Sequence, residues 1–228
     1  MEPILDFFKS LHGEHLDDFI QWGGYALVAA IVFAETGLLF GFFLPGDSLL
    51  FVAGFLVGSG LIKPPGFLPQ DPVGAWVVLS ALLMTAAFVG NSTGYWVGSK
   101  AGPKLFEREN SRFFKREYLH KTREFYEKHG AKTIILAEFM PFARTFAPVV
   151  AGIAGLPFKR FMLFNLMGVV IWINTMTLLG FTLGNASFEF AGLKVVVREH
   201  IEKVIVVIVL LSVLPAVIHI IKARRGAE

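Results

Sequence analysis

Long apolar stretches alternate with short polar connections along the chain, and their lengths predict membrane segments. Residues 73–98 and 161–183 are each long enough to cross a bilayer as one helix, because about 20 apolar residues span its hydrocarbon core. A third stretch, about 201–221, ends at basic residues and predicts another full span. Two further stretches, 23–61 and 133–157, are apolar but interrupted by proline and glycine. The pattern predicts an all-α polytopic membrane protein with about three full transmembrane spans.

Both interrupted stretches contain residues that break a helix. These candidate break residues are Pro45, Gly46, Pro141, Pro148 and Gly152. Broken backbone at membrane depth is tolerated only where it is buried in protein or lines a wet cavity. We therefore predict that each stretch folds as a re-entrant hairpin, with the breaks at Pro45–Gly46 and at Pro148.

The two predicted hairpins resemble each other. Glu35 stands ten residues before Pro45 in the first, and Glu138 stands ten residues before Pro148 in the second. Each hairpin follows an amphipathic stretch and precedes a full span. If the hairpins are inserted from opposite faces of the membrane, the chain contains an inverted repeat, as many secondary transporters do.

The single membrane domain, 1–228, then consists of two repeats and a last span. Repeat 1 covers about 3–98, and repeat 2 covers about 104–184. Residues 3–21 have the pattern of an amphipathic helix that lies in the membrane interface and ends at Gly23–Gly24.

A basic amphipathic segment, 100–130, opens the second repeat. Residues 100–132 carry ten Lys or Arg against five Glu. Since cytoplasmic loops carry an excess of Lys and Arg, this bias places the segment in the cytoplasm, together with the basic C-terminus. Its basic face is either a solvated surface or a site for anionic lipid headgroups.

The composition excludes most soluble functions. The chain is 54% hydrophobic and 17% charged, has no cysteine, and has a mean hydropathy of +0.61. Without cysteine there are no disulfides, no Cys-ligated zinc and no thiol nucleophile. The six histidines are scattered, and the sequence contains neither a phosphate-binding glycine loop nor a nucleophile motif. We therefore expect no cofactor, no metal, no nucleic-acid partner and no enzymatic activity.

Four charged residues lie inside the interrupted stretches: Glu35, Asp47, Glu138 and Arg144. A charge at membrane depth costs about 2.5 kcal/mol or more, so it faces a cavity or a partner. Arg144 presents a planar fork of donors that matches a phosphate group. It therefore either binds an anionic lipid headgroup or forms an ion pair with Glu138 or with an acid of the first hairpin.

The carboxylates of the first hairpin also have two interpretations. If desolvated, Glu35 and Asp47 could take and release protons near neutral pH and couple transport to a proton gradient. Alternatively, Glu35 braces the broken backbone and Asp47 caps the arm that begins at Ser48.

Glycines recur at helical spacing near the end of the span 73–98. Gly90, Gly94 and Gly98 lie on one side of the predicted helix, and such small residues let another helix approach closely. The partner is either a helix of the same chain or a second copy, and the oligomeric state stays open.

Several motifs together resemble one protein family. They are Phe-x-Glu-x-Gly at 33–37, Phe-Leu-Pro-Gly-Asp-Ser-Leu-Leu at 43–50, Phe-Tyr-Glu-Lys-His-Gly at 125–130, and Pro-x-x-Arg-Thr-Phe-Ala-Pro-x-x-Ala-Gly at 141–152. The chain resembles the bacterial DedA family, the prokaryotic branch of the VTT-domain proteins, over nearly its whole length. The resemblance implies an inner-membrane protein with two opposed re-entrant hairpins that serves membrane and envelope homeostasis.

The resemblance also implies site residues. The essential acidic pair of the family corresponds to Glu35 and Asp47, and its arginine in the second hairpin corresponds to Arg144. This chain departs from the pattern at two positions. Many members have arginine where this chain has Glu138, and aspartate where it has Asn91.

The function expected is that of a lipid transporter or flippase. Some family members are implicated in returning undecaprenyl phosphate or phosphatidylethanolamine across the bilayer, and eukaryotic relatives behave as scramblases. We therefore expect movement of an anionic phospholipid such as undecaprenyl phosphate toward the cytoplasmic leaflet, with proton coupling as an option. The alternatives are a nonselective scramblase and a non-transporting membrane-assembly factor. A lipid-modifying enzyme is disfavoured because no metal or nucleophile set is recognisable.

Overall fold

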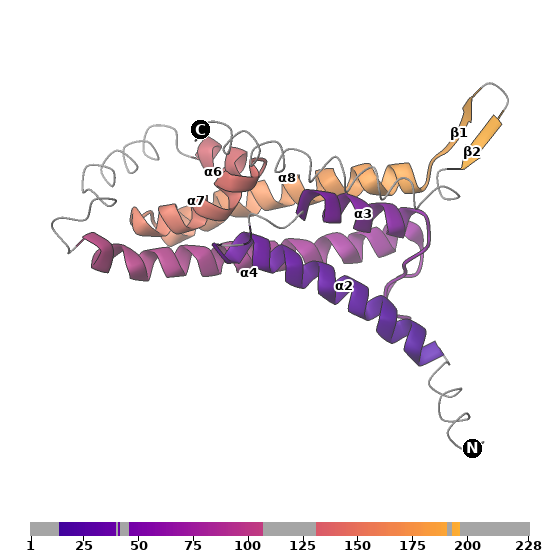
Figure 1. The fold of residues 1–228 in the computed structure, drawn as a ribbon, viewed down its shortest axis with the longest axis horizontal. Coiled ribbons are helices and arrows are strands. Elements are labelled where there is room, and N and C mark those ends of the chain that lie inside the picture. Colours follow the sequence, from indigo (N-terminus) through magenta and orange to yellow (C-terminus); the bar gives the residue numbers. More distant parts are fainter. Residues whose placement is uncertain (1–13, 40, 42–45, 107–130, 191–192, 197–228) are drawn as a thin grey trace, which may run out of the picture. The chain divides into compact units, whose positions relative to one another are not determined.

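The structure is a computed structural model that describes residues 14–39, 41, 46–106, 131–190 and 193–196. The described residues are mainly helical, and their elements are labelled in Figure 1. The helices are α2 (Glu14–Gly37), α3 (Gly46–Gly58), α4 (Pro72–Phe106), α6 (Ala131–Ala137), α7 (Pro141–Ile153) and α8 (Phe158–Gly184). Two short strands, β1 (Ser187–Phe190) and β2 (Leu193–Val196), pair antiparallel with Ser187 opposite Val196. This β-hairpin is the exception to the predicted all-α fold.

Two helices are long and apolar enough to cross a membrane. They cover Pro72–Gly102 in α4, which is 31 residues, and Phe158–Gly184 in α8, which is 27 residues. Both match predicted full spans. Large apolar side chains remain exposed on both helices, among them Val89 on α4 and Leu163 on α8. The third predicted span, 201–221, and most of the basic segment 100–130 lie outside the described residues.

The first interrupted stretch begins differently from the prediction. Helix α2 runs without a break through Gly23 and Gly24, where the sequence predicted the end of a separate amphipathic helix. Glycine costs a helix only about 1 kcal/mol relative to alanine, and the apolar sequence continues after this pair. The break falls later, between Gly37 and Gly46. The predicted Gly46 therefore begins α3, whereas Pro45 and residues 3–13 lie outside the described part of the chain.

The second interrupted stretch breaks at residues 138–140 rather than at Pro148. Helix α7 starts with Pro141, and Pro148 lies inside it. Proline is well placed at the first position of a helix, because the N–H that it lacks would have no partner within the helix. Gly152 also lies inside α7. The prediction that Pro148 and Gly152 break the helix was therefore wrong, whereas Pro141 stands at the break.

The described chain forms two compact units. Of the described residues, the first unit combines those within 14–28, 46–82 and 175–196, and the second combines those within 29–41 and 83–174. Both long helices contribute to each unit, since α4 and α8 each contain a boundary between the units.

In the first unit, glycines let α3 pack closely on the C-terminal part of α8. A Cβ on Gly54 or Gly58 of α3 would collide with the backbone of Thr177 or Phe181. Conversely, a Cβ on Gly180 would collide with the backbone of Phe51. Residue numbers rise together along this contact, so the two segments run parallel.

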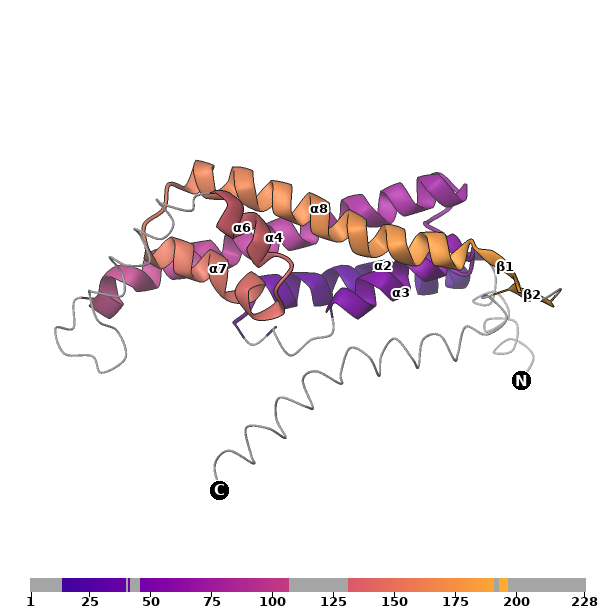
Figure 2. The same cartoon turned by 90° about the horizontal axis from the view of Figure 1, so that it is seen from above.

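In the second unit, α7 packs in the same way on the C-terminal half of α4, and Figure 2 shows these two segments side by side. A Cβ on Gly98 of α4 would collide with the backbone of Val149, and one on Gly152 of α7 with that of Tyr95. Gly94 lies beside Pro148. These segments also run parallel.

The two glycine contacts follow one numbering rule. Gly180 meets Phe51 and Gly184 meets Phe55, whereas Gly98 meets Val149 and Gly102 meets Ile153. The partners on α3 and α7 differ by 98 in residue number, and the glycines on α8 and α4 differ by 82. The two units thus contain the same helix contact, which we call the glycine seam.

Candidate functional site

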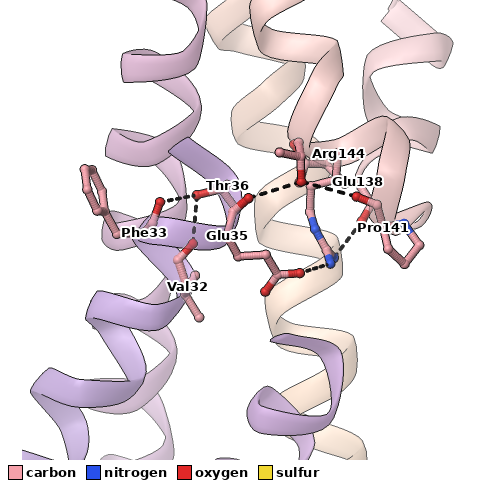
Figure 3. Close-up of polar contacts among 8 residues, drawn as sticks. Val32, Phe33, Glu35, Thr36, Glu138, Pro141 and Arg144 are labelled. Carbon is pink, nitrogen blue, oxygen red and sulfur yellow. Dashed lines mark hydrogen bonds and ion pairs between the residues drawn. The ribbon is translucent and has the colours of Figure 1, made fainter. Parts of the chain in front are cut away.

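Charged residues from the two interrupted stretches meet inside the second unit. Glu35 lies in the last turn of α2, and Arg144 lies in the first turn of α7. Figure 3 shows their side chains pointing toward each other, with Arg144 Nη2 donating to Glu35 Oε1. Both residues are 1% exposed. The ion pair with an acid of the first hairpin, one of the alternatives predicted from the sequence, is therefore present.

Two further contacts hold the Arg144 guanidinium in place. Its Nη1 donates to the backbone oxygen of Glu138 at 3.1 Å. Its Cζ lies 3.9 Å from the ring centroid of Trp172 on α8, which is fully buried. A cation over an indole face is attracted by the ring quadrupole, more strongly where water is excluded. Arg144 is thus held by a carboxylate, a carbonyl and an aromatic ring.

The end of α2 is fixed by its neighbours. Thr145 Oγ1 of α7 donates to the backbone oxygen of Glu35 at 3.1 Å, which satisfies a carbonyl near the helix end. Thr36 Oγ1 donates to the Val32 oxygen at 2.9 Å. Gly90 of α4 makes room for this end, because a Cβ there would collide with the Thr36 hydroxyl. The Glu35 carboxylate is therefore attached to a well-anchored turn.

Glu138 lies at the other side of the site, in the break between α6 and α7. Asn91 Nδ2 donates to Glu138 Oε1 at 2.9 Å and to Asn165 Oδ1 at 2.6 Å. All three side chains are buried, with Glu138 2% exposed. On α8, Gly168 leaves room for the Glu138 side chain. We call Asn91, Glu138 and Asn165 the amide–acid cluster.

The sequence did not identify every member of this site. Asn91 stood out only as a departure from the family pattern. Glu138 is the other departure, and the two side chains are hydrogen-bonded to each other. Neither Asn165 nor Trp172 was predicted to belong to the site. Asn165 had a usable signal, since an asparagine within an apolar span is expensive unless it has a polar partner.

The fourth predicted charged residue belongs to the first unit. Asp47 is the second residue of α3 and is partly buried. Its assignment to a common site with Glu35 and Arg144 stays a prediction.

The predicted packing glycines have partners within the second unit. Gly90 faces Thr36 of α2, whereas Gly94 and Gly98 face α7. Of the two alternatives left by the sequence, packing within the chain is the one present here. Among the described residues, no three His, Cys, Asp or Glu side chains are grouped so that they could hold a metal ion.

These features define a helical membrane protein with a buried charged site where broken helices meet. The VTT domain family model matches residues 44–182. The protein DedA of Escherichia coli (strain K12) is 40% identical over 228 residues, which cover 98% of this chain and 95% of that protein. The chain therefore belongs to the DedA family of VTT-domain membrane proteins, as its motifs predicted.

Two further relatives support this membership. An uncharacterized membrane protein of Mycobacterium leprae (strain TN) is 43% identical over 188 residues, which cover 82% of this chain and 75% of that protein. The inner membrane protein YghB of Escherichia coli (strain K12) is 29% identical over 206 residues, which cover 90% and 83% of the two chains. No solved structure matches.

Proposed function

We propose that the protein is a transporter that moves an anionic phospholipid, such as undecaprenyl phosphate, across the inner membrane toward the cytoplasmic leaflet. The observation that carries this proposal is the buried Arg144, held between Glu35 and Trp172 at a helix break. The family is one of membrane proteins, and relatives such as YghB are named inner membrane proteins. A permanently charged guanidinium at such a place has the chemistry to receive a phosphate headgroup.

Substrate binding would be an exchange of anions. Carboxylate and phosphate both accept two parallel hydrogen bonds from a guanidinium, so a phosphate headgroup can replace Glu35 as the partner of Arg144. Because a buried ion pair loses much stability when one partner is removed, Arg144 needs an anion at every stage. Glu35 would therefore hold the guanidinium in the lipid-free protein and release it to the headgroup.

The architecture that we propose for this activity is an inverted repeat with two opposed re-entrant hairpins. The two glycine seams support it, since each hairpin arm packs parallel on a long helix. In the first unit α4 and α8 run antiparallel, since Trp76 contacts Phe181 and Ser80 contacts Thr177. They also run antiparallel in the second unit, where Asn174 contacts Met84 and Ser92 contacts Met162. The proposed architecture requires α3 and α7 to enter the membrane from opposite faces. The basic C-terminus would lie in the cytoplasm.

Labelling of single cysteines tests this topology without background, because the chain has no cysteine. Gly66, between α3 and α4, and Pro157, between α7 and α8, are both exposed. In intact cells, a cysteine at 66 should react with an impermeant reagent, and one at 157 should react only after the cells are opened. Reaction of both from outside would contradict the inverted repeat.

The proposed transport activity is tested with purified protein in liposomes that carry a labelled phosphate lipid in one leaflet. We expect protein-dependent movement of the unmodified lipid, and loss of this movement in Arg144→Ala. Arg160→Ala is the matched control, because Arg160 is an exposed arginine of α8.

Other outcomes would select the alternatives. Equal movement of anionic and neutral lipids would indicate a scramblase. Absence of movement with an intact fold would favour a membrane-assembly factor, in which the Glu35–Arg144 pair only braces the helix ends. Chemical change of the lipid would indicate an enzyme.

A further inference from the structure

We propose that Glu138 binds a single exchangeable proton, and that the side-chain amides of Asn91 and Asn165 accommodate the protonated and the ionised carboxyl alike. This inference deepens the proposed function, on which its biological use rests, by naming the proton-carrying group of the same site. Proton binding itself can be measured in the absence of lipid movement.

The balance of charge is the first argument. Glu35 and Arg144 form a buried ion pair with each other, so Glu138 is a second carboxylate beside a single guanidinium in this cluster. The charged groups that act on Glu138 are Arg144 on α7 and Glu35 on α2, whereas α4 and α8 face it with amides. An ionised carboxylate is expensive to bury unless it is paired. One proton on Glu138 makes the site neutral.

The hydrogen bonds of Glu138 are the second argument. Its Oε1 accepts from Asn91, but its Oε2 is buried and has no hydrogen-bond partner among the described residues. A buried acceptor that receives no hydrogen bond is destabilised by the loss of its hydration, most of all when it carries charge. Protonation of Glu138 removes this charge, and the carboxyl group then becomes a donor through Oε1, the oxygen that faces Asn91.

The amide pair is the third argument. Toward an ionised Glu138, Asn91 Nδ2 donates both to the carboxylate and to Asn165 Oδ1. A half-turn of both amide groups places Asn91 Oδ1 between a protonated Glu138 and Asn165 Nδ2, and both of these then donate to it. The oxygen and nitrogen of an amide are nearly equal in size and shape, so the same two hydrogen bonds among these side chains can form in either state.

Spare bonding capacity at the cluster fits this exchange. In the described part of the chain, Asn91 Oδ1 and Asn165 Nδ2 are buried without hydrogen-bond partners. These are the acceptor and the donor that the half-turn brings into use. A carboxylic acid between purely apolar neighbours would have no acceptor for its proton, and one between two cations would not hold a proton.

Infrared difference spectroscopy of the purified, lipid-embedded full chain tests the proposal directly. A step from low to high pH should remove the carbonyl stretch of a protonated carboxylic acid. In Glu138→Gln, which keeps an acceptor for Asn91, this band should be lost. Asp71→Asn is the control, because Asp71 is an exposed carboxylate outside the cluster. A titrating band that survives in Glu138→Gln, or that disappears in Glu35→Gln alone, would overturn the assignment.

Two further variants test the role of the amides and guard against a failure of Glu138→Gln to fold. Asn91→Leu should move the pH midpoint of the band by about one unit, a tenfold change in proton affinity, because the amide bonds the charged carboxylate more strongly than the neutral acid. Asn174→Leu, on α8 outside the cluster, should leave the midpoint unchanged. The double variant Asn91→Asp with Glu138→Arg supplies a fixed ion pair and should lose the band. An unchanged midpoint in Asn91→Leu, or a persistent band in the double variant, would contradict the proposal.

If the band behaves as expected while liposomes show no lipid movement, the proton site stands and the transport function fails. If lipid moves but no titrating band arises from Glu138, the transport function stands and the proton site fails.

Discussion

The two glycine seams have the same backbone contact but different polar surroundings. Beside the first seam, Thr177 of α8 bonds the Trp76 indole at 3.1 Å and the Ser80 hydroxyl at 3.3 Å, and all three groups are neutral. Beside the second, α7 brings Arg144 to Glu35. The backbone contact is thus the same in the two units, and the side chains beside it determine which of the contacts lies next to buried charges.

The numbering rule of the seams relates residues of the charged site to counterparts that carry no charge. The offset of 98 relates Phe51 to Val149. The same offset makes Gly46, the first residue of α3, the counterpart of Arg144 in the numbering. The offset of 82 relates the buried Asn91 and Asn165 to Ile173 and Leu83, which are equally buried. The residues of the polar site therefore have counterparts under these offsets that are small or apolar.

Of the substitutions considered beside the two glycine seams, Arg144→Ala should have the largest effect on stability and transport. Loss of one partner of a buried ion pair costs about 3–5 kcal/mol, because Glu35 is left charged without its partner. We expect both a lower unfolding temperature and loss of lipid movement in liposomes. Arg144→Lys should also transport poorly if the planar fork is required.

The double variant Arg144→Ala with Glu35→Gln separates these two effects. It removes the stranded charge, so it should regain stability but not transport. Recovery of transport in this double variant would show that the arginine acts only as a brace.

Substitutions in the two seams should have similar effects of intermediate size. Gly98→Ala and Gly180→Ala each force a Cβ against a backbone oxygen, of Val149 and Phe51 respectively. Overpacking of this kind costs about 1–3 kcal/mol, and we expect comparable losses from the two variants in thermal unfolding.

Gly23→Ala is the control for the seams, because a Cβ at Gly23 of α2 meets nothing within 4 Å. It should be neutral or stabilise the helix by up to about 1 kcal/mol. If only one of the two seam variants is destabilised, the seams are not equivalent.

The smallest effect is expected beside the first glycine seam, between α3 and α8, where the polar groups are neutral. Thr177→Val removes the hydroxyl that Trp76 and Ser80 share, and the net loss of such a hydrogen bond costs about 0.5–1.5 kcal/mol. Lipid transport per folded molecule should remain at the parent rate.

Thr182→Val, at an exposed threonine that bonds only its own helix, should change neither stability nor transport measurably. A loss of transport in Thr177→Val without a loss of folded protein would extend the functional site into the first unit.

The sequence predicted the spans well, because their signal is local. Apolar length alone located α4 and α8, although α4 extends to Phe106 beyond the predicted end at 98. The position of the second break was not predictable from proline alone. Pro148 is the eighth residue of a helix that has already started at Pro141, and it packs beside Gly94 of α4.

The site was predictable where a single residue carries the signal. Glu35, Glu138 and Arg144 stood out because each is expensive in lipid. The partner of Arg144 was predicted only as one of several alternatives, because Glu35 is 109 positions away. The partner of Asn91 on α8 was not predicted, because it is 74 positions away. Such distances along the chain are closed only by the packing of the helices.

The indole of Trp172 gives the site an optical reporter of its own. It is fully buried and lies in contact with the one group that we expect a headgroup to engage. The emission of an indole depends on the charges next to its ring, so displacement of the guanidinium should appear as a change in colour or intensity. With Trp22, Trp76 and Trp96 replaced by phenylalanine, one intrinsic fluorophore would allow headgroup arrival to be followed in real time, without any attached dye.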